Sequence, residues 1–188
     1  MLRRVLNALL LALTLAYPLA VYFGLQHFEP RVFGALLGAL LVLRKWHSTR
    51  RIAAGLMTSE RISFAVLGAY TLIIVIGNSE FLLLLYPVII SLSLLWVFGR
   101  SLIHTPTVIE RIARLHEPDL SPAGVIYTRH VTQAWCAFFI VNASIAIGTI
   151  FASREAWLFY NGFLAYLLMG LLFAGERLVR KHIRSQLA

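Results

Sequence analysis

The chain has 188 residues, of which 60% are hydrophobic and only 13% are charged, and its mean hydropathy is +0.80. A soluble domain could not cover its surface with so few polar groups, so the composition excludes that class and predicts one integral membrane domain over residues 1–188. The net charge of +9 does not indicate a nucleic-acid partner, because the basic residues fall between apolar stretches.

Six stretches without a charged residue predict an all-α bundle of about six transmembrane helices, since a charge near the bilayer centre is costly. They cover residues 5–28, 32–43, 62–79, 81–99, 130–153 and 156–175. The first follows Arg3 and Arg4 and has no convincing cleavage site, so we expect an uncleaved signal anchor. The second would reach only about 18 Å. It is either extended by snorkelling Arg and Lys side chains or forms a re-entrant hairpin.

The distribution of Lys and Arg favours six crossings. With the N-terminus inside, 15 of the 17 basic residues fall on the cytoplasmic side, and only Arg31 and Arg154 fall outside. This asymmetry is what the positive-inside rule predicts, and it predicts that both termini lie on the cytoplasmic side of the membrane. The tryptophans lie near predicted helix ends, where we expect interface anchors; they are Trp46, Trp96, Trp135 and Trp157.

Short outer connections predict tight antiparallel hairpins between spans three and four and between spans five and six. Two small-residue pairs, Gly34 with Gly38 and Gly170 with Ala174, have the spacing of helix contact motifs. We expect them to pack within the monomer rather than in a dimer. The lone Cys136 lies in an apolar segment and is interpreted as a small buried residue.

The inner connection near residues 106–116 predicts a short amphipathic helix, with Thr105 as its N-cap and Pro106 at its first position. We expect its apolar face to lie on the inner leaflet or against the bundle. Polar residues in and around this connection form a candidate cluster for acid–base or metal chemistry: Glu110, Arg111, Arg114, His116, Glu117, Arg129 and His130. Their spacing matches no known ligand or catalytic signature, so caps and solvated turns are the favoured interpretation, with no cofactor, metal or catalytic residue predicted.

Few polar residues fall inside or at the ends of the predicted spans. Asn142 is near the middle of span five, Asn161 near the outer end of span six, and Glu176 at its inner end. The two asparagines are not expected to be level with each other. After span six, a continuing helix would place four cations on one face: Arg177, Arg180, Lys181 and Arg184. Together with Arg111 and Arg114 they are a candidate surface for anionic phospholipid or an acidic partner, although topology control explains their number equally well.

Several motifs between residues 106 and 176 resemble one family. They are the segments 106–114, 117–118, 127–129, 135–136, 160–162, 167–170 and 174–176, which include Glu117-Pro118, Trp135-Cys136 and Ala174-Gly-Glu176. This pattern resembles small multi-span bacterial membrane proteins encoded in aryl-polyene and xanthomonadin-type lipid clusters, beside acyl carrier proteins, ketosynthases and dehydratases. The resemblance implies an accessory role at the inner membrane in making, presenting or exporting an acyl or polyene lipid.

Three hypotheses for function follow. The first is a non-catalytic membrane component that holds soluble acyl-carrier-linked enzymes at the inner leaflet. The second is a small lipid or metabolite transporter, which should show a polar path between helices. The third is a membrane-embedded acyl-transferring enzyme, which needs convergent histidine and carboxylate groups.

Overall fold

The computed structural model describes residues 17–25, 27–47, 58–115 and 117–187, with side chains described up to residue 43 in the second range and up to residue 179 in the last. In that part of the chain every regular element is a helix. In order they are α2 (Tyr17–Gly24), α3 (Pro30–His47), α5 (Thr58–Gly77), α6 (Glu80–Leu84), α7 (Tyr86–Ile103), α8 (Val108–Arg114), α9 (Pro122–Ala152), α10 (Arg154–Phe159), the π-helical turn η1 (Tyr160–Leu164) and α11 (Ala165–Leu187).

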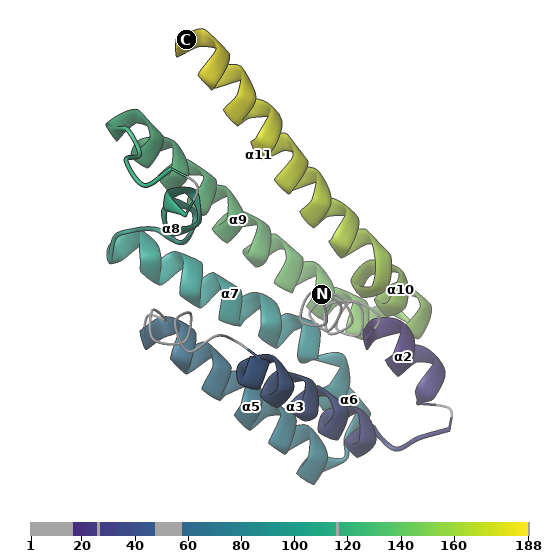
Figure 1. Cartoon of the computed structure of the whole chain (residues 1–188). Helices are drawn as coiled ribbons and strands as arrows, with labels where there is room; N and C mark the ends of the chain where they lie inside the picture. The colour runs from purple at the N-terminus through teal and green to yellow at the C-terminus, as the bar shows by residue number, and fades with distance from the viewer. Residues whose placement is uncertain (1–16, 26, 48–57, 116, 188) are drawn as a thin grey trace.

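The long helices pack in the order of the chain. Helix α3 packs on α5, α5 on α7, and α7 on α9, while α2 packs against α10 and η1 (Figure 1). Helix α11 leaves η1 and runs alongside α9, and the short α8 lies against the first part of α9 (Figure 1). This is the all-α helical bundle that the sequence predicts.

Four segments are long and apolar enough to cross a membrane: α5, α7, α9 and the continuous stretch 154–179 through α10, η1 and α11. They confirm four of the six predicted spans. The apolar part of α3, Pro30–Leu43, is shorter than these. Of the first predicted span only the end, α2, is described, so the signal-anchor prediction lies outside the described residues.

The three short connections predicted on one side of the membrane meet at one end of the bundle. The backbone N–H of Arg31 donates to Asn78 Oδ1 at 3.0 Å, and the Asn78 amide donates to Glu29 at 3.2 Å. Arg154 pairs with Glu80 at 2.6 Å. These contacts join the start of α3 to the end of α5, and the start of α10 to the start of α6.

Glycines allow α3 to approach α5 closely. A Cβ atom on Gly34 would lie 2.8 Å from the Ile74 side chain, and one on Gly38 would lie 3.4 Å from the Thr71 hydroxyl. The Gly34–Gly38 pair therefore packs within the monomer, as predicted. For Gly170 the described part of the chain shows no such packing, because a Cβ there would meet none of its atoms within 4 Å.

Candidate functional site

Helix α8 begins later than its sequence signature predicts. Its N-cap is Thr107, whose hydroxyl accepts from the N–H of Glu110 at 3.2 Å, and Ser101 accepts from the N–H of Val108 at 3.1 Å. The prediction of Thr105 as N-cap is thus wrong. Both residues suit a cap chemically, but only Thr107 stands three residues before an N–H that it can satisfy in this fold.

The apolar residues of α8 are divided between the bundle and the outside. Ile112 is 50% exposed and Leu115 is 81% exposed, whereas Val108, Glu110 and Ala113 are buried. Of the two predicted positions for the apolar face, the bundle accounts for Val108, whereas Ile112 and Leu115 are exposed on the described part of the chain. Their orientation fits contact with lipid at the membrane surface.

Two ion pairs hold the polar side of α8. The Arg111 guanidinium donates to Glu60 of α5 at 2.6 Å. Arg114 donates through Nε and Nη2 to Glu110 at 2.9 and 2.8 Å, and also to the Pro118 carbonyl at 2.9 Å. The sequence predicts these two arginines on an exposed cationic face, but Arg111 fastens α8 to α5, and Arg114 bonds within α8 and to the Pro118 carbonyl that follows it.

Other described members of the candidate cluster form contacts of their own. Arg129 donates to the Leu102 carbonyl at 2.9 Å and so ties α9 to the end of α7. His130 is exposed and lines a groove between α9 and α11. The backbone N–H of Glu117 closes the end of α8 on the Ala113 carbonyl, and His116 lies outside the described residues. Among the described residues, no three His, Cys, Asp or Glu side chains gather as a metal site would require.

A polar network crosses the apolar middle of the bundle. The Asn142 amide of α9 donates to Ser91 of α7 at 2.9 Å, and its carbonyl oxygen accepts from the Tyr160 hydroxyl of η1 at 3.0 Å. The asparagine is buried, and every one of these links joins different helices. Such bonds contribute about 0.6 kcal/mol on average between membrane helices.

The second asparagine, on η1, contacts a later part of α9. Asn161 donates to Thr149 of α9 at 3.4 Å and to the Trp157 carbonyl at 3.0 Å. Thr149 lies seven residues after Asn142 on α9. This confirms that Asn142 and Asn161 are not level. The Oδ1 atom of Asn161 is buried and has no hydrogen-bond partner in the described chain. At the opposite end of this hairpin, the Glu176 carbonyl accepts from the Tyr127 hydroxyl at 3.1 Å.

The predicted span 81–99 is not one helix, because the chain breaks between α6 and α7 at Leu85. Pro87 is the physical reason: proline has no N–H to donate to the Leu83 carbonyl four residues earlier. A carbonyl freed inside a membrane must find another donor.

Three aromatic side chains supply those donors, and we call Tyr17, Tyr70 and Trp157 the aromatic clasp. The Tyr17 hydroxyl of α2 donates to the Leu83 carbonyl at 2.7 Å. The Tyr70 hydroxyl of α5 donates to the Leu82 carbonyl at 2.7 Å. The Trp157 indole N–H of α10 donates to the Leu84 carbonyl at 3.0 Å. The clasp thus fastens three elements to the broken helix.

Trp157 is only 1% exposed, so its predicted role as an interface anchor is wrong. The N–H of an indole near a helix end can donate to groups at the membrane interface or to a buried carbonyl. Here the break between α6 and α7 provides a buried carbonyl. Trp96 is exposed with the Arg100 guanidinium 5.7 Å from its ring, which agrees with the anchor prediction. Trp135 is half-buried and packs on Phe139, and the Trp46 side chain lies outside the described residues.

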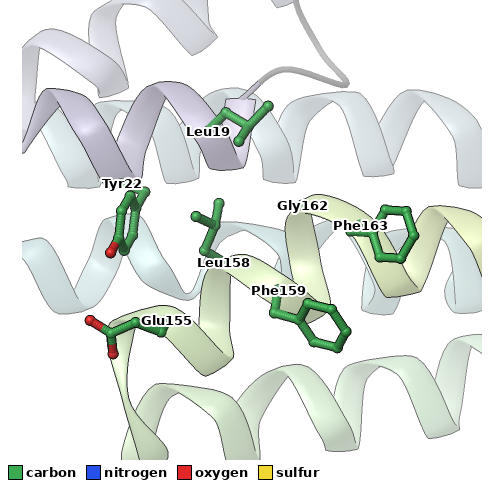
Figure 2. Close-up of a pocket in the computed structure, with 7 residues that line it drawn as sticks. All are labelled: Leu19, Tyr22, Glu155, Leu158, Phe159, Gly162 and Phe163. Carbon is green, nitrogen blue, oxygen red and sulfur yellow. The ribbon is translucent and has the colours of Figure 1, made fainter.

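Three open grooves follow the helices. The first, of 320 Å³, lies between α2 and α10–η1, and Figure 2 shows its apolar lining with Glu155 at one edge and Gly162 beside Leu158. The second, of 390 Å³, lies between α9 and α11 and is lined by Trp135, His130 and Glu176 among others. The third, of 430 Å³, lies between α3, α5 and α7.

No family model, curated protein or solved structure matches this chain. The resemblance to proteins of aryl-polyene lipid clusters therefore stays a prediction.

Proposed function

We propose that this chain is a non-catalytic component of the bacterial inner membrane that holds soluble acyl-carrier-linked enzymes at the cytoplasmic surface while an acyl or aryl-polyene lipid is made or exported. The observation that supports the proposal is the separation of charge between the two ends of the bundle. The pathway itself comes from the family resemblance.

Charge is concentrated at the end that carries α8. Of the eight arginines with described side chains, two lie at the end where Glu29 and Glu80 form their contacts, and the other six lie toward the α8 end. They are Arg61, Arg100, Arg111, Arg114, Arg129 and Arg177. In the six-span topology the inner side has 15 basic and 5 acidic residues, a charge of +10, against 2 basic and 3 acidic residues outside, a charge of −1.

Only some of these cations are available to a partner. Arg111 and Arg114 are committed to Glu60 and Glu110. Arg61, Arg100 and Arg177 are exposed, and the tail adds Arg180, Lys181 and Arg184, whose side chains lie outside the described part. Basic surfaces of this kind attract acidic carrier proteins and steer their approach, and they also attract anionic phospholipid.

Matched charge reversals test recruitment. We would compare R177E/K181E, on the tail, with R31E/R154E at the opposite end, since both pairs change the net charge by the same amount. A purified acidic acyl carrier protein should be recovered with the wild type and with the R31E/R154E variant at low salt, and lost as salt rises. The tail variant should recover about tenfold less, equivalent to about 1.4 kcal/mol. Equal recovery by the two correctly inserted variants would contradict recruitment by the tail.

A small lipid or metabolite transporter is the second candidate. It is favoured by the buried link from Asn142 to Ser91 and Tyr160 and by the break between α6 and α7, because transporters place binding sites at discontinuous helices. The clasp already satisfies the freed carbonyls, which favours a structural role for the break. Uptake by proteoliposomes that is abolished by Asn142→Leu, with Ser144→Leu on the exposed side of α9 as control, would support transport instead.

A further inference from the structure

The groove between α3, α5 and α7 is apolar along most of its length and acidic at one end. Leu40 of α3, Phe64 of α5 and Leu94 of α7 are among its walls, and its volume is 430 Å³. The charged residue among those that line it is Glu60, at the end nearest α8, where it pairs with Arg111. An occupant should therefore be apolar, with any charge that it carries near Glu60 positive.

The described part of the chain begins at the other end of this groove. Tyr17, the first residue of α2, packs on Tyr86 with the ring centroids 5.2 Å apart, and both belong to a buried cluster that includes Leu37. Tyr86 and Leu37 also line the groove. The residues that precede Tyr17 are therefore attached to the chain at the mouth of the groove.

The direction of α2 points those residues toward α8. After α2 the chain reaches Glu29, which accepts from Asn78 just beyond the end of α5. The start of α5, at Glu60, contacts α8, so Asn78 lies at the opposite end of the bundle. Because α2 runs away from α8, a chain that keeps its direction reaches Tyr17 from the α8 side, along the groove.

The segment 5–16, which precedes the described residues, has the length and composition that the groove requires. Ten of its twelve residues are apolar and none is charged. As a helix it would span about 18 Å, against about 17 Å along α7 from Tyr86 to Val97. Pro18 has no N–H for the Thr14 carbonyl, so we expect a bend there, which membrane helices tolerate.

One face of such a helix would fill the groove. Leu13, Leu10 and Leu6 stand four, seven and eleven residues before the buried Tyr17, so a helix places them on its face. With four carbon groups in each side chain and about 30 Å³ for each group, taken as water-sized, three leucines occupy about 360 Å³. The groove, at 430 Å³, accommodates them.

The same register brings positive charge to the acidic end. If Tyr17 is level with Tyr86, seven residues earlier Leu10 is level with Ser93, whose carbonyl accepts from Ser63 of α5 at 3.2 Å. Glu60 lies one turn closer to α8 than Ser63. Arg4 would then be within about 5 Å of Glu60 along the helix axis, and a carboxylate can accept from more than one arginine.

We propose that the segment 5–16 continues α2 as a helix that occupies this groove, with its leucine face against α3, α5 and α7 and with Arg3 and Arg4 beside Glu60. The groove is then the contact surface of the first span and is closed to lipid. Arg3 and Arg4 join the end of the bundle that carries α8. This docking goes beyond the proposed function and does not depend on partner recruitment.

Disulfide cross-linking of the full chain in phosphatidylcholine nanodiscs tests the docking, in a Cys136→Ser background. The test pair is Leu10→Cys with Leu94→Cys. The first control joins Leu10→Cys to Leu92→Cys, because Leu92 is on α7 but 46% exposed and does not line the groove. The second joins Ala8→Cys to Leu94→Cys, because Ala8 is half a turn away from the leucine face. Elution as a single species with wild-type helicity would show that each variant is folded.

We expect oxidation by copper phenanthroline to link the test pair within one chain at about ten times the yield of either control, since a disulfide forms only between close Cβ atoms. Leu6→Cys should link to Val97→Cys, near Glu60, and not to Leu37→Cys at the other end. Mass spectrometry of the linked peptides identifies each product.

A yield for the test pair that is no higher than the control yields would overturn the proposal. Linked dimers in place of linked monomers would also overturn it, since a second copy would then supply the occupant. Preferential linkage of Leu6→Cys to Leu37→Cys would overturn the orientation and, with it, the placement of Arg3 and Arg4 at Glu60.

Discussion

The aromatic clasp predicts a specific cost for removing one hydroxyl group. Tyr17 is buried, and its hydroxyl donates at 2.7 Å to the Leu83 carbonyl, whose usual helical donor would be the missing N–H of Pro87. Tyr17→Phe keeps the ring in place and leaves a buried acceptor unsatisfied. We expect a loss of about 1–2 kcal/mol of unfolding free energy, below the upper range for soluble proteins because bonds between membrane helices are weaker on average.

That loss is measurable as a thermal shift. For a chain of this size it corresponds to a decrease of about 2–8 °C in Tm, read from tryptophan fluorescence or circular dichroism in a mild detergent. Tyr22→Phe is the control, because Tyr22 is on the same helix and its hydroxyl bonds none of the residues that the structure describes. Its Tm should match that of the wild type.

A double-mutant cycle with Pro87→Ala isolates the cause. Alanine at 87 restores an N–H that can donate to the Leu83 carbonyl, so Tyr17→Phe should cost much less in that background, with a coupling of about 1 kcal/mol. If Tyr17→Phe and Tyr22→Phe lower Tm equally, or if the cost of Tyr17→Phe is the same with and without Pro87, the clasp does not act as we argue.

Three further predictions address topology and packing. If the chain has six spans with both termini inside, reporter fusions should read inside after Met57, outside after Gly77, and inside after Pro118 and Ala188. An outside reading after Met57 would show that the second span does not cross the membrane. Ile112→Asp should speed proteolysis of α8 if its exposed face rests on the membrane, and unchanged cleavage would contradict that contact. Gly34→Leu should destabilise the bundle by about 1–3 kcal/mol by pushing on Ile74, whereas Gly170→Leu, in open space, should be near neutral in the same Tm assay.

Features that depend on local signals could be predicted from the sequence. The charge-free windows identified the four long apolar segments, since the cost of a buried charge acts on every residue of a span. The Gly34–Gly38 spacing predicted a close helix contact within the monomer, which the structure shows with α5, and the tail does continue span six as one helix to Leu187. Each of these signals lies within a few turns of the structure it predicts.

Features that depend on partners distant in the chain could not be predicted from the sequence. Nothing near Arg111 indicates that Glu60, 51 residues away, binds it, and the same holds for Trp157 and the Leu84 carbonyl, 73 residues away. One signal was present: Pro87 inside a charge-free window implies a freed carbonyl, and an apolar segment can tolerate that only with a donor nearby. The sequence contains the donors but does not show which tyrosine or tryptophan reaches the break.

The arginines at the α8 end show why counting charges does not locate a binding surface. The positive-inside rule treats all of them alike, because insertion responds to their number. In the folded bundle they divide into two roles. Arg114 is paired with Glu110 and is therefore a poor contact for a partner, whereas Arg129 bonds the Leu102 carbonyl but remains exposed. Exposed cations such as Arg177 are available for a long-range, salt-screened attraction to an acidic protein or anionic lipid. Arg111 acts internally as well, because its Nη2 atom holds α8 on α5 through Glu60. Substitution of Arg111 would therefore disturb the docking of α8 as well as the surface charge, which is why the recruitment surface is tested with the tail.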